Sequence, residues 1–242
     1  MGAPQPNTEP QARVLAFPHV AQTMRGALAA ALKQHRLPEL LIEQLIRAAE
    51  MHAQTHRSET PEAALARALA GRMRCAGIDF QKARGILLLG PAGSGKSAVA
   101  AKIAHIALLS GRKVELASAA DGLALFRTAT FESDSLMVME ASGFNPVNRK
   151  ALNAFAALGE ADGVESIGVV SAAGDAQDVS EIVAALRLPR IIVTGLDRTA
   201  RLGATLAAIT GGACLAHVTY GPRPDDGLES LTPEDLAKLL LD

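Results

Sequence analysis

The chain has 242 residues, of which 49% are apolar and 20% charged, with a formal net charge of −1. A chain of this length buries roughly 70% or more of its unfolded surface, so its core needs neither a metal nor a disulfide. The near-zero charge excludes the basic surface of proteins that grip nucleic acid through its phosphates. Polar interruptions of the apolar runs and an N-terminus without an apolar h-region argue against a membrane span and a secretion signal. The composition therefore predicts a soluble cytoplasmic protein, with Cys75 and Cys214 reduced.

The first 78 residues are expected to contain a tail and a small helical N domain. Residues 1–18 carry four prolines and no periodicity, which predicts a mobile tail. In residues 19–78, apolar residues recur at helical spacing from Leu41 to Ala49. A further helix is expected where Thr60 can cap and Pro61 can occupy the first turn.

Residues 79–242 alternate short apolar runs with helical segments, which predicts an α/β domain. Unbroken apolar strands between helices indicate a parallel sheet covered by helices on both faces. The expected strands are Ile86–Leu89, Val114–Ala117, Leu136–Met139, Ser166–Val170, Ile191–Val193 and Leu215–Thr219. The expected helices are Ser97–Leu109, Val147–Leu158, Ala176–Leu186, Arg198–Ile209 and Pro233–Leu241.

A phosphate-binding loop follows the first expected strand. Residues 90–97, GPAGSGKS, satisfy G-x-x-x-x-G-K-[ST] between a strand and a helix. Inward-pointing backbone N–H groups and the helix N-terminus would hold a polyphosphate, Lys96 would reach its outer phosphates, and Ser97 would bind Mg²⁺. The predicted P-loop residues are Gly90, Gly93, Ser94, Gly95, Lys96, Ser97 and Ala98. A structural strand-to-helix turn is the alternative, but it explains neither the lysine nor the spacing.

Asp197 is the candidate for binding the base, because it follows the strand Ile191–Val193. Ligands of open α/β sheets bind at the carboxyl ends of the strands. A carboxylate there could accept two hydrogen bonds from guanine N1 and N2, a pattern that adenine lacks. The alternative is that Asp197 only caps the next helix, and position alone does not separate the two.

The turn Thr194–Asp197 with residues 199–203, TARLG, resembles the base-recognition segment of the signal-recognition-particle (SRP) type GTPases, and most of all their flagellar branch. The resemblance covers most of residues 36–242 and includes a closing loop at Tyr220–Asp226. It implies a helical N domain, a P-loop G domain, bound GTP and Mg²⁺, and pairing of two G domains as a homodimer or with a second SRP-type G domain. It also implies flagellar or membrane-targeting partners and a peripheral place at the inner membrane. Further nucleotide contacts implied are Gly143, Thr194, Asp197 and Gly221, with Glu140 joining Ser97 at the metal.

The chain departs from this family at three places. Gly195 stands where the family has a lysine whose stem packs over the base, and Glu140 stands where it has aspartate. The region between Val114 and Leu136 lacks the family's Asp-Thr-x-Arg motif and is shorter by a helix and a strand. No residue is therefore assigned to the activation of water or the stabilisation of charge during hydrolysis. Lys102 and Arg112 are expected to be ordinary surface charges.

Three functions follow from these observations. The first is an SRP-type GTP-binding switch in flagellar placement or assembly or in membrane protein targeting. The second is a degenerate pseudo-GTPase that serves as an interaction scaffold. The third is an unrelated P-loop ATPase or small-molecule kinase, which a preference for GTP over ATP would exclude.

Overall fold

The computed structural model describes residues 18–55, 60–126, 135–143, 148, 150, 163–187 and 189–242. The N-terminal helices are α1 (Pro18–Gln34), α2 (Glu39–Thr55) and α3 (Pro61–Ala70). The remaining elements are β1 (Gly85–Leu89), α4 (Lys96–Leu109), β2 (Lys113–Ser118), α5 (Ala119–Phe126), β3 (Ser135–Glu140), β4 (Val164–Ser171), α7 (Ala176–Leu186), β5 (Arg190–Thr194), the 3₁₀ turn η1 (Leu196–Arg198), α8 (Gly203–Thr210), β6 (Cys214–Val218), the 3₁₀ turn η2 (Pro224–Asp226) and α9 (Pro233–Leu241).

The strands form one parallel sheet in the order β2-β3-β1-β4-β5-β6. Strand β1 is central and buried along its whole length, as expected for a parallel strand covered on both faces. Strand β2 lies at the edge and has only exposed and half-buried residues, a difference from the inner strands that the sequence did not predict. The parallel α/β architecture predicted from the sequence is confirmed.

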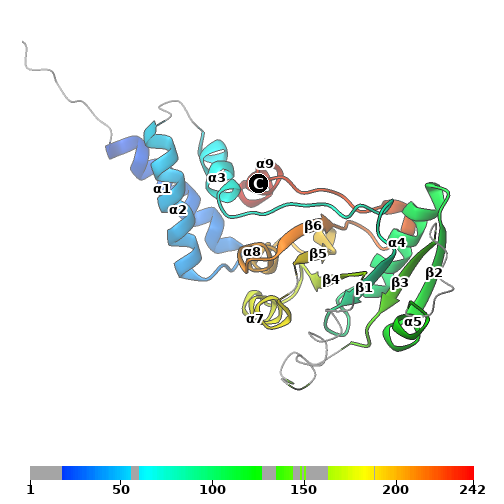
Figure 1. Cartoon of the computed structure of the whole chain (residues 1–242). Coiled ribbons are helices and arrows are strands. Elements are labelled where there is room, and N and C mark those ends of the chain that lie inside the picture. Colours follow the sequence, from blue (N-terminus) through cyan, green and yellow to red (C-terminus); the bar gives the residue numbers. More distant parts are fainter. Residues whose placement is uncertain are drawn as a thin grey trace, which may run out of the picture.

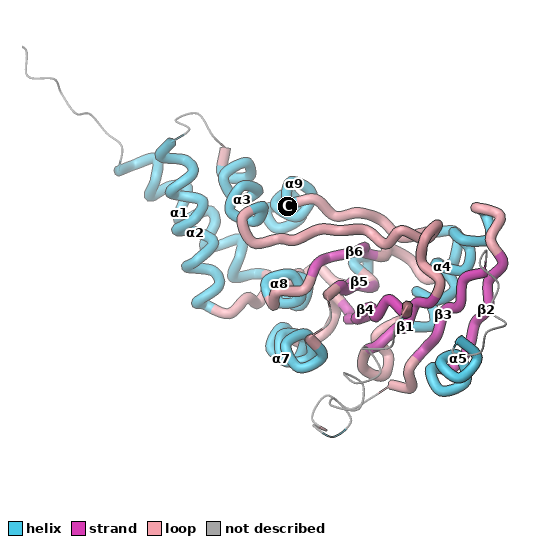
Figure 2. The backbone as a smooth tube through the Cα atoms, viewed as in Figure 1, coloured by secondary structure: helices cyan, strands magenta, loops and turns pink. Residues whose placement is uncertain are grey.

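Helices cover both faces of this sheet (Figures 1 and 2). On β1, Ile86 and Leu88 pack in the same apolar cluster as α4, together with Ile78 from the segment after α3. Leu87 and Leu89 point to the other face, where their cluster includes residues of α7 and α8 and continues into α1, α2, α3 and α9. The core therefore runs without a break from the sheet into the helical unit.

The helical unit is built from helices of both ends of the described chain. Helix α9 packs against α3 and α1, so the last helix completes the bundle that the first three begin (Figure 1). The predicted cap of α3 is present, because the Thr60 hydroxyl accepts the N–H of Ala63 and Pro61 opens the helix. Helix α9 begins with a capping box between Thr232 and Asp235.

Two sequence expectations are wrong. Helix α8 begins at Gly203 instead of Arg198, because Gly195 has a left-handed backbone (φ +68°) and Thr199 is extended. Lys102 and Arg112 are buried instead of being surface charges. The Arg112 guanidinium donates to three backbone carbonyls, those of Phe80, Ala83 and Ser135, and so ties separate segments together.

Several expectations concern regions outside the described residues, including the tail at residues 1–18, of which the structure describes only Pro18, and most of the expected helix Val147–Leu158. Within the described part, no helix combines the length and apolar character that a membrane crossing requires. Both cysteines are free thiols.

Candidate nucleotide site

The phosphate-binding loop connects β1 to α4 at the carboxyl edge of the sheet. Gly95 is the N-cap of α4, and the first intrahelical bond runs from Val99 N–H to the Gly95 carbonyl. The N–H groups of Lys96, Ser97 and Ala98 consequently have no acceptor one turn earlier in the helix. Such a helix start favours an anion, because the free N–H groups and the helix dipole both attract negative charge.

The Lys96 ammonium is folded back onto the loop that carries it. Its Nζ donates to the carbonyls of Gly90, at 3.0 Å, and Pro91, at 2.8 Å. Burial lowers the pKa of Lys96, while the nearby Glu140 carboxylate acts in the opposite direction. The charge thus sits in a place where it is poorly solvated, and an anion entering the loop would stabilise it.

The predicted metal ligands meet directly. The Ser97 hydroxyl donates to Oε2 of Glu140 at 2.7 Å, which joins the start of α4 to the end of β3. Both side chains, with Gly93, Lys96 and Gly143, line an open cavity of about 600 Å³. Glu140 therefore lines the same cavity as the P-loop residues.

Gly143 lies against the P-loop with no room for a side chain. A methyl group on Gly143 would lie 2.7 Å from Cα and 2.9 Å from N of Ala92. These are backbone atoms, so only a shift of one loop could relieve the overlap. The loop after β3 is accordingly in van der Waals contact with the phosphate-binding loop.

Thr194 locks the P-loop to the end of β5. Its hydroxyl lies 2.7 Å from the carbonyl oxygen of Ser94 and 3.2 Å from that of Val170. A hydroxyl has one proton, so the shorter contact is the principal hydrogen bond. Thr194 is buried, and its role visible here is to position the loop.

Asp197 is exposed in the turn η1, just beyond β5. The turn is held by Thr219 at the end of β6, which accepts the N–H of Gly195 at its hydroxyl and the N–H of Leu196 at its carbonyl. The interpretation of Asp197 as the cap of the following helix is wrong, since Leu202 occupies the N-cap position of α8. Asp197 does not line the cavity at Lys96. It follows β5, whose carboxyl end lies at the same edge of the sheet as the P-loop.

Gly221 belongs to the closing loop after β6, and the Asp226 carboxylate packs directly behind it. Asp226 accepts the backbone N–H of Arg223, which is the main reason its pKa is lowered, and it also accepts the Arg223 guanidinium. Lys102, from α4, donates to the Arg223 carbonyl at 2.6 Å. Sequence reasoning missed Lys102, because its partner is a carbonyl 121 residues further along the chain.

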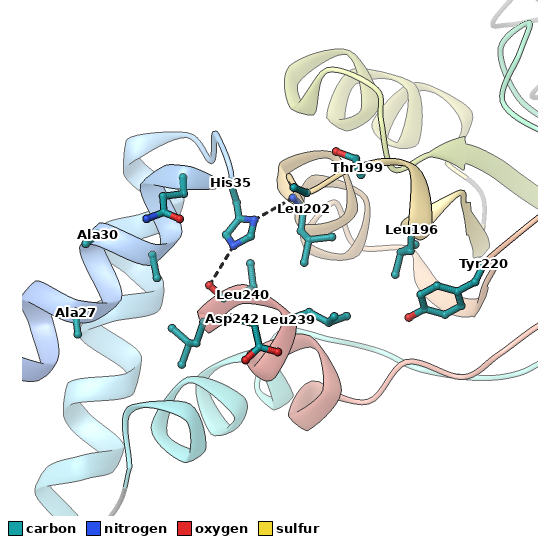
Figure 3. Close-up of a pocket in the computed structure, with 14 residues that line it drawn as sticks. Ala27, Ala30, His35, Leu196, Thr199, Leu202, Tyr220, Leu239, Leu240 and Asp242 are labelled. Atoms are coloured by element: carbon teal, nitrogen blue, oxygen red, sulfur yellow. Dashed lines mark hydrogen bonds between the residues drawn. The ribbon is translucent and has the colours of Figure 1, made fainter.

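A second cavity, of about 550 Å³, lies between α1, α9 and the segment after β5 (Figure 3). His35 is buried beside it, and its Nδ1 accepts the N–H of Leu202 at 3.3 Å. Its Nε2 lies 3.0 Å from the Leu240 carbonyl, to which it donates. One imidazole therefore connects α1 to the start of α8 and to α9.

No family model matches the chain, and no curated protein matches it. Among solved structures, FlhF complexed with GTP and Mg²⁺ has a TM-score of 0.70 at 16% identity, covering 90% of this chain and 99% of that one. The signal recognition particle receptor FtsY from Elizabethkingia anophelis, in complex with GDP, has a TM-score of 0.67 at 15% identity, covering 94% and 86%. FtsY from Thermotoga maritima has a TM-score of 0.66 at 16% identity, covering 93% and 94%. The fold is that of the SRP-type GTPases.

The SRP-type fold explains the order of the helices and strands, but the predicted site residues do not all lie at one cavity. The P-loop, Glu140 and Gly143 come together, whereas Asp197 and Gly221 lie on neighbouring loops of the same edge. In the described ranges, no group of three or more His, Cys, Asp or Glu side chains is arranged to hold a metal ion.

Proposed function

We propose that this chain binds GTP with Mg²⁺ and works as a nucleotide-dependent switch of the SRP type. The observation that carries the proposal is the meeting of Lys96, Ser97 and Glu140 at one cavity, with Asp197 on a loop of the same sheet edge. In this arrangement the P-loop holds the phosphates and Asp197 binds the base. The further contacts proposed are Gly90, Gly93, Ser94, Gly95, Ala98, Gly143, Thr194 and Gly221.

The donor atoms at the proposed metal site suit Mg²⁺. Magnesium prefers oxygen ligands. The Ser97 hydroxyl and the Glu140 carboxylate would supply such ligands, and the two lie together, joined by a hydrogen bond of 2.7 Å. When bound, Mg²⁺ would neutralise phosphate charge, and the longer side chain of Glu140 still reaches the serine.

The switch would operate through the loop after β3. Gly143 contacts the P-loop backbone, so a γ-phosphate that binds its N–H would hold this loop, and loss of the phosphate would release it. We propose the output to be flagellar placement or assembly, or membrane protein targeting, at the inner face of the membrane. The partner would be a second copy of this chain or another SRP-type G domain.

Equilibrium binding of fluorescent GTP and ATP analogues with Mg²⁺ tests this proposal. We expect guanine-selective binding that Lys96→Ala weakens at least 100-fold, because a charge-assisted contact to phosphate is lost. Asp197→Asn should lose guanine selectivity and gain affinity for xanthosine triphosphate, because xanthine has a carbonyl in place of the C2 amino group. Equal binding of GTP and ATP by the wild type would refute the guanine assignment and favour an ATPase or kinase.

A specific observation favours a second candidate, a degenerate pseudo-GTPase that binds nucleotide weakly or not at all and serves as an interaction scaffold. Asp121, in the first turn of α5, accepts the Ser118 hydroxyl at 2.7 Å, and the Ser118 hydroxyl accepts the backbone N–H of Asp121. Asp121 is thus held at the start of α5, within the region between Val114 and Leu136 that lacks the family's Asp-Thr-x-Arg motif. A phosphate-release assay on the chain alone and at high protein concentration separates the candidates, since a scaffold gives no turnover in either.

A further inference from the structure

The Arg198 side chain is folded over Gly195. A Cβ atom on Gly195 would lie 3.2 Å from Cδ of Arg198, 3.6 Å from Cγ and 3.8 Å from Cβ. The stem of Arg198 therefore fills the space that a side chain at position 195 would enter. It does so beside Asp197, at the carboxyl end of β5.

The backbone explains why this space is not filled from position 195 itself. Gly195 has φ +68° and donates its N–H to Thr219, so its left-handed conformation is fixed by the end of β6. A lysine in that conformation would be strained, because its Cβ atom would crowd the following carbonyl oxygen. A side chain from the next turn can cover the same place without that strain.

The chemistry of Arg198 suits a planar aromatic ligand. Its side chain is exposed, and no ion pair with another described residue holds the guanidinium. An arginine presents a flat, weakly hydrated cation on an apolar stem, and both parts stack on the face of a nucleobase. A base whose edge is bound by Asp197 would expose its faces to the neighbouring residue.

We propose that Arg198 covers one face of the guanine base whose edge Asp197 binds. The inference rests on the proposed function and adds a binding residue to it. Arg198 thereby takes the place of the missing side chain at position 195. Its contribution is to the base and is independent of the number of phosphates.

Binding measurements with GTP and GDP on Arg198→Ala test this inference. Base stacking of ordinary strength predicts a loss of roughly 5- to 150-fold in affinity, the same for both nucleotides. Arg198→Met keeps an unbranched stem and should retain most of the affinity. Arg201→Ala is the matched control, because Arg201 is an exposed arginine of the same segment and does not cover Gly195. It should bind like the wild type.

The outcomes separate this inference from the proposed function. A loss that is larger for GTP than for GDP and shrinks with added salt would assign Arg198 to the phosphates and overturn the inference. Wild-type affinity in Arg198→Ala, together with losses in Lys96→Ala and Asp197→Asn, would overturn the inference alone. Absence of guanine binding by the wild type would overturn both.

Discussion

Replacing Thr194 by valine tests the lock between β5 and the P-loop. Valine has nearly the same shape, so the change removes the hydroxyl that donates to the Ser94 carbonyl and little else. Leaving a buried carbonyl without its donor costs about 1–3 kcal/mol. For a chain of this size, a central value of about 2 kcal/mol corresponds to a decrease in Tm of roughly 4–8 °C.

The same substitution should affect GTP binding, because an unlocked loop must be reordered by the nucleotide. We expect Thr194→Val to lower the affinity about 10-fold or more in calorimetric titrations, with Mg²⁺ present. Thr194→Ser is the control, since it keeps the hydroxyl and should bind GTP within about threefold of the wild type. A valine variant that melts within 1 °C of the wild type, by circular dichroism, and binds GTP equally well would show that the Thr194 hydroxyl does not hold the P-loop in place.

Three further predictions use other contacts. Gly143→Ala should lower GTP affinity at least 10-fold in titration calorimetry with little change in Tm, because its methyl group meets the Ala92 backbone; unchanged affinity would mean that the loop moves aside. His35→Ala removes two hydrogen bonds and should cost about 2–4 kcal/mol in urea unfolding, whereas the half-buried His105→Ala should cost under about 1 kcal/mol. The lowered pKa of Asp226 means that its carboxylate stabilises the closing loop fully above pH 3.8 and less as the pH falls through the folded value. The Tm difference between wild type and Asp226→Asn should thus be constant from pH 8 to 5 and vanish in stronger acid, and a difference that persists there would contradict this assignment.

The sheet and the P-loop could be predicted because their signals are local. The strand at Gly85–Leu89, the GPAGSGKS loop and the helix after it lie within 25 consecutive residues. Apolar runs and glycine spacing are enough to specify such a segment. The capping of α3 by Thr60 was predictable for the same reason.

The remainder of the site depends on contacts that no short window contains. Lys102 can be buried because its ammonium donates a hydrogen bond to a carbonyl of the closing loop, and Arg112 because its guanidinium donates to three distant carbonyls. The late start of α8 follows from Gly195, whose N–H is held by the hydroxyl of Thr219, the residue after β6. A sequence pattern identifies a charge or a glycine, but only the tertiary structure supplies the partner that determines its role.

The packing of α9 on α3 and α1 bears on the order in which the molecule folds. The apolar faces of the first helices are not fully covered until residues 233–241 have been synthesised. All strands of the sheet lie between these two parts of the bundle in the sequence. Contacts between such distant segments form late, because a long loop must close first. During synthesis α1, α2 and α3 would therefore present exposed apolar surface to chaperones for longer than the P-loop and its strand.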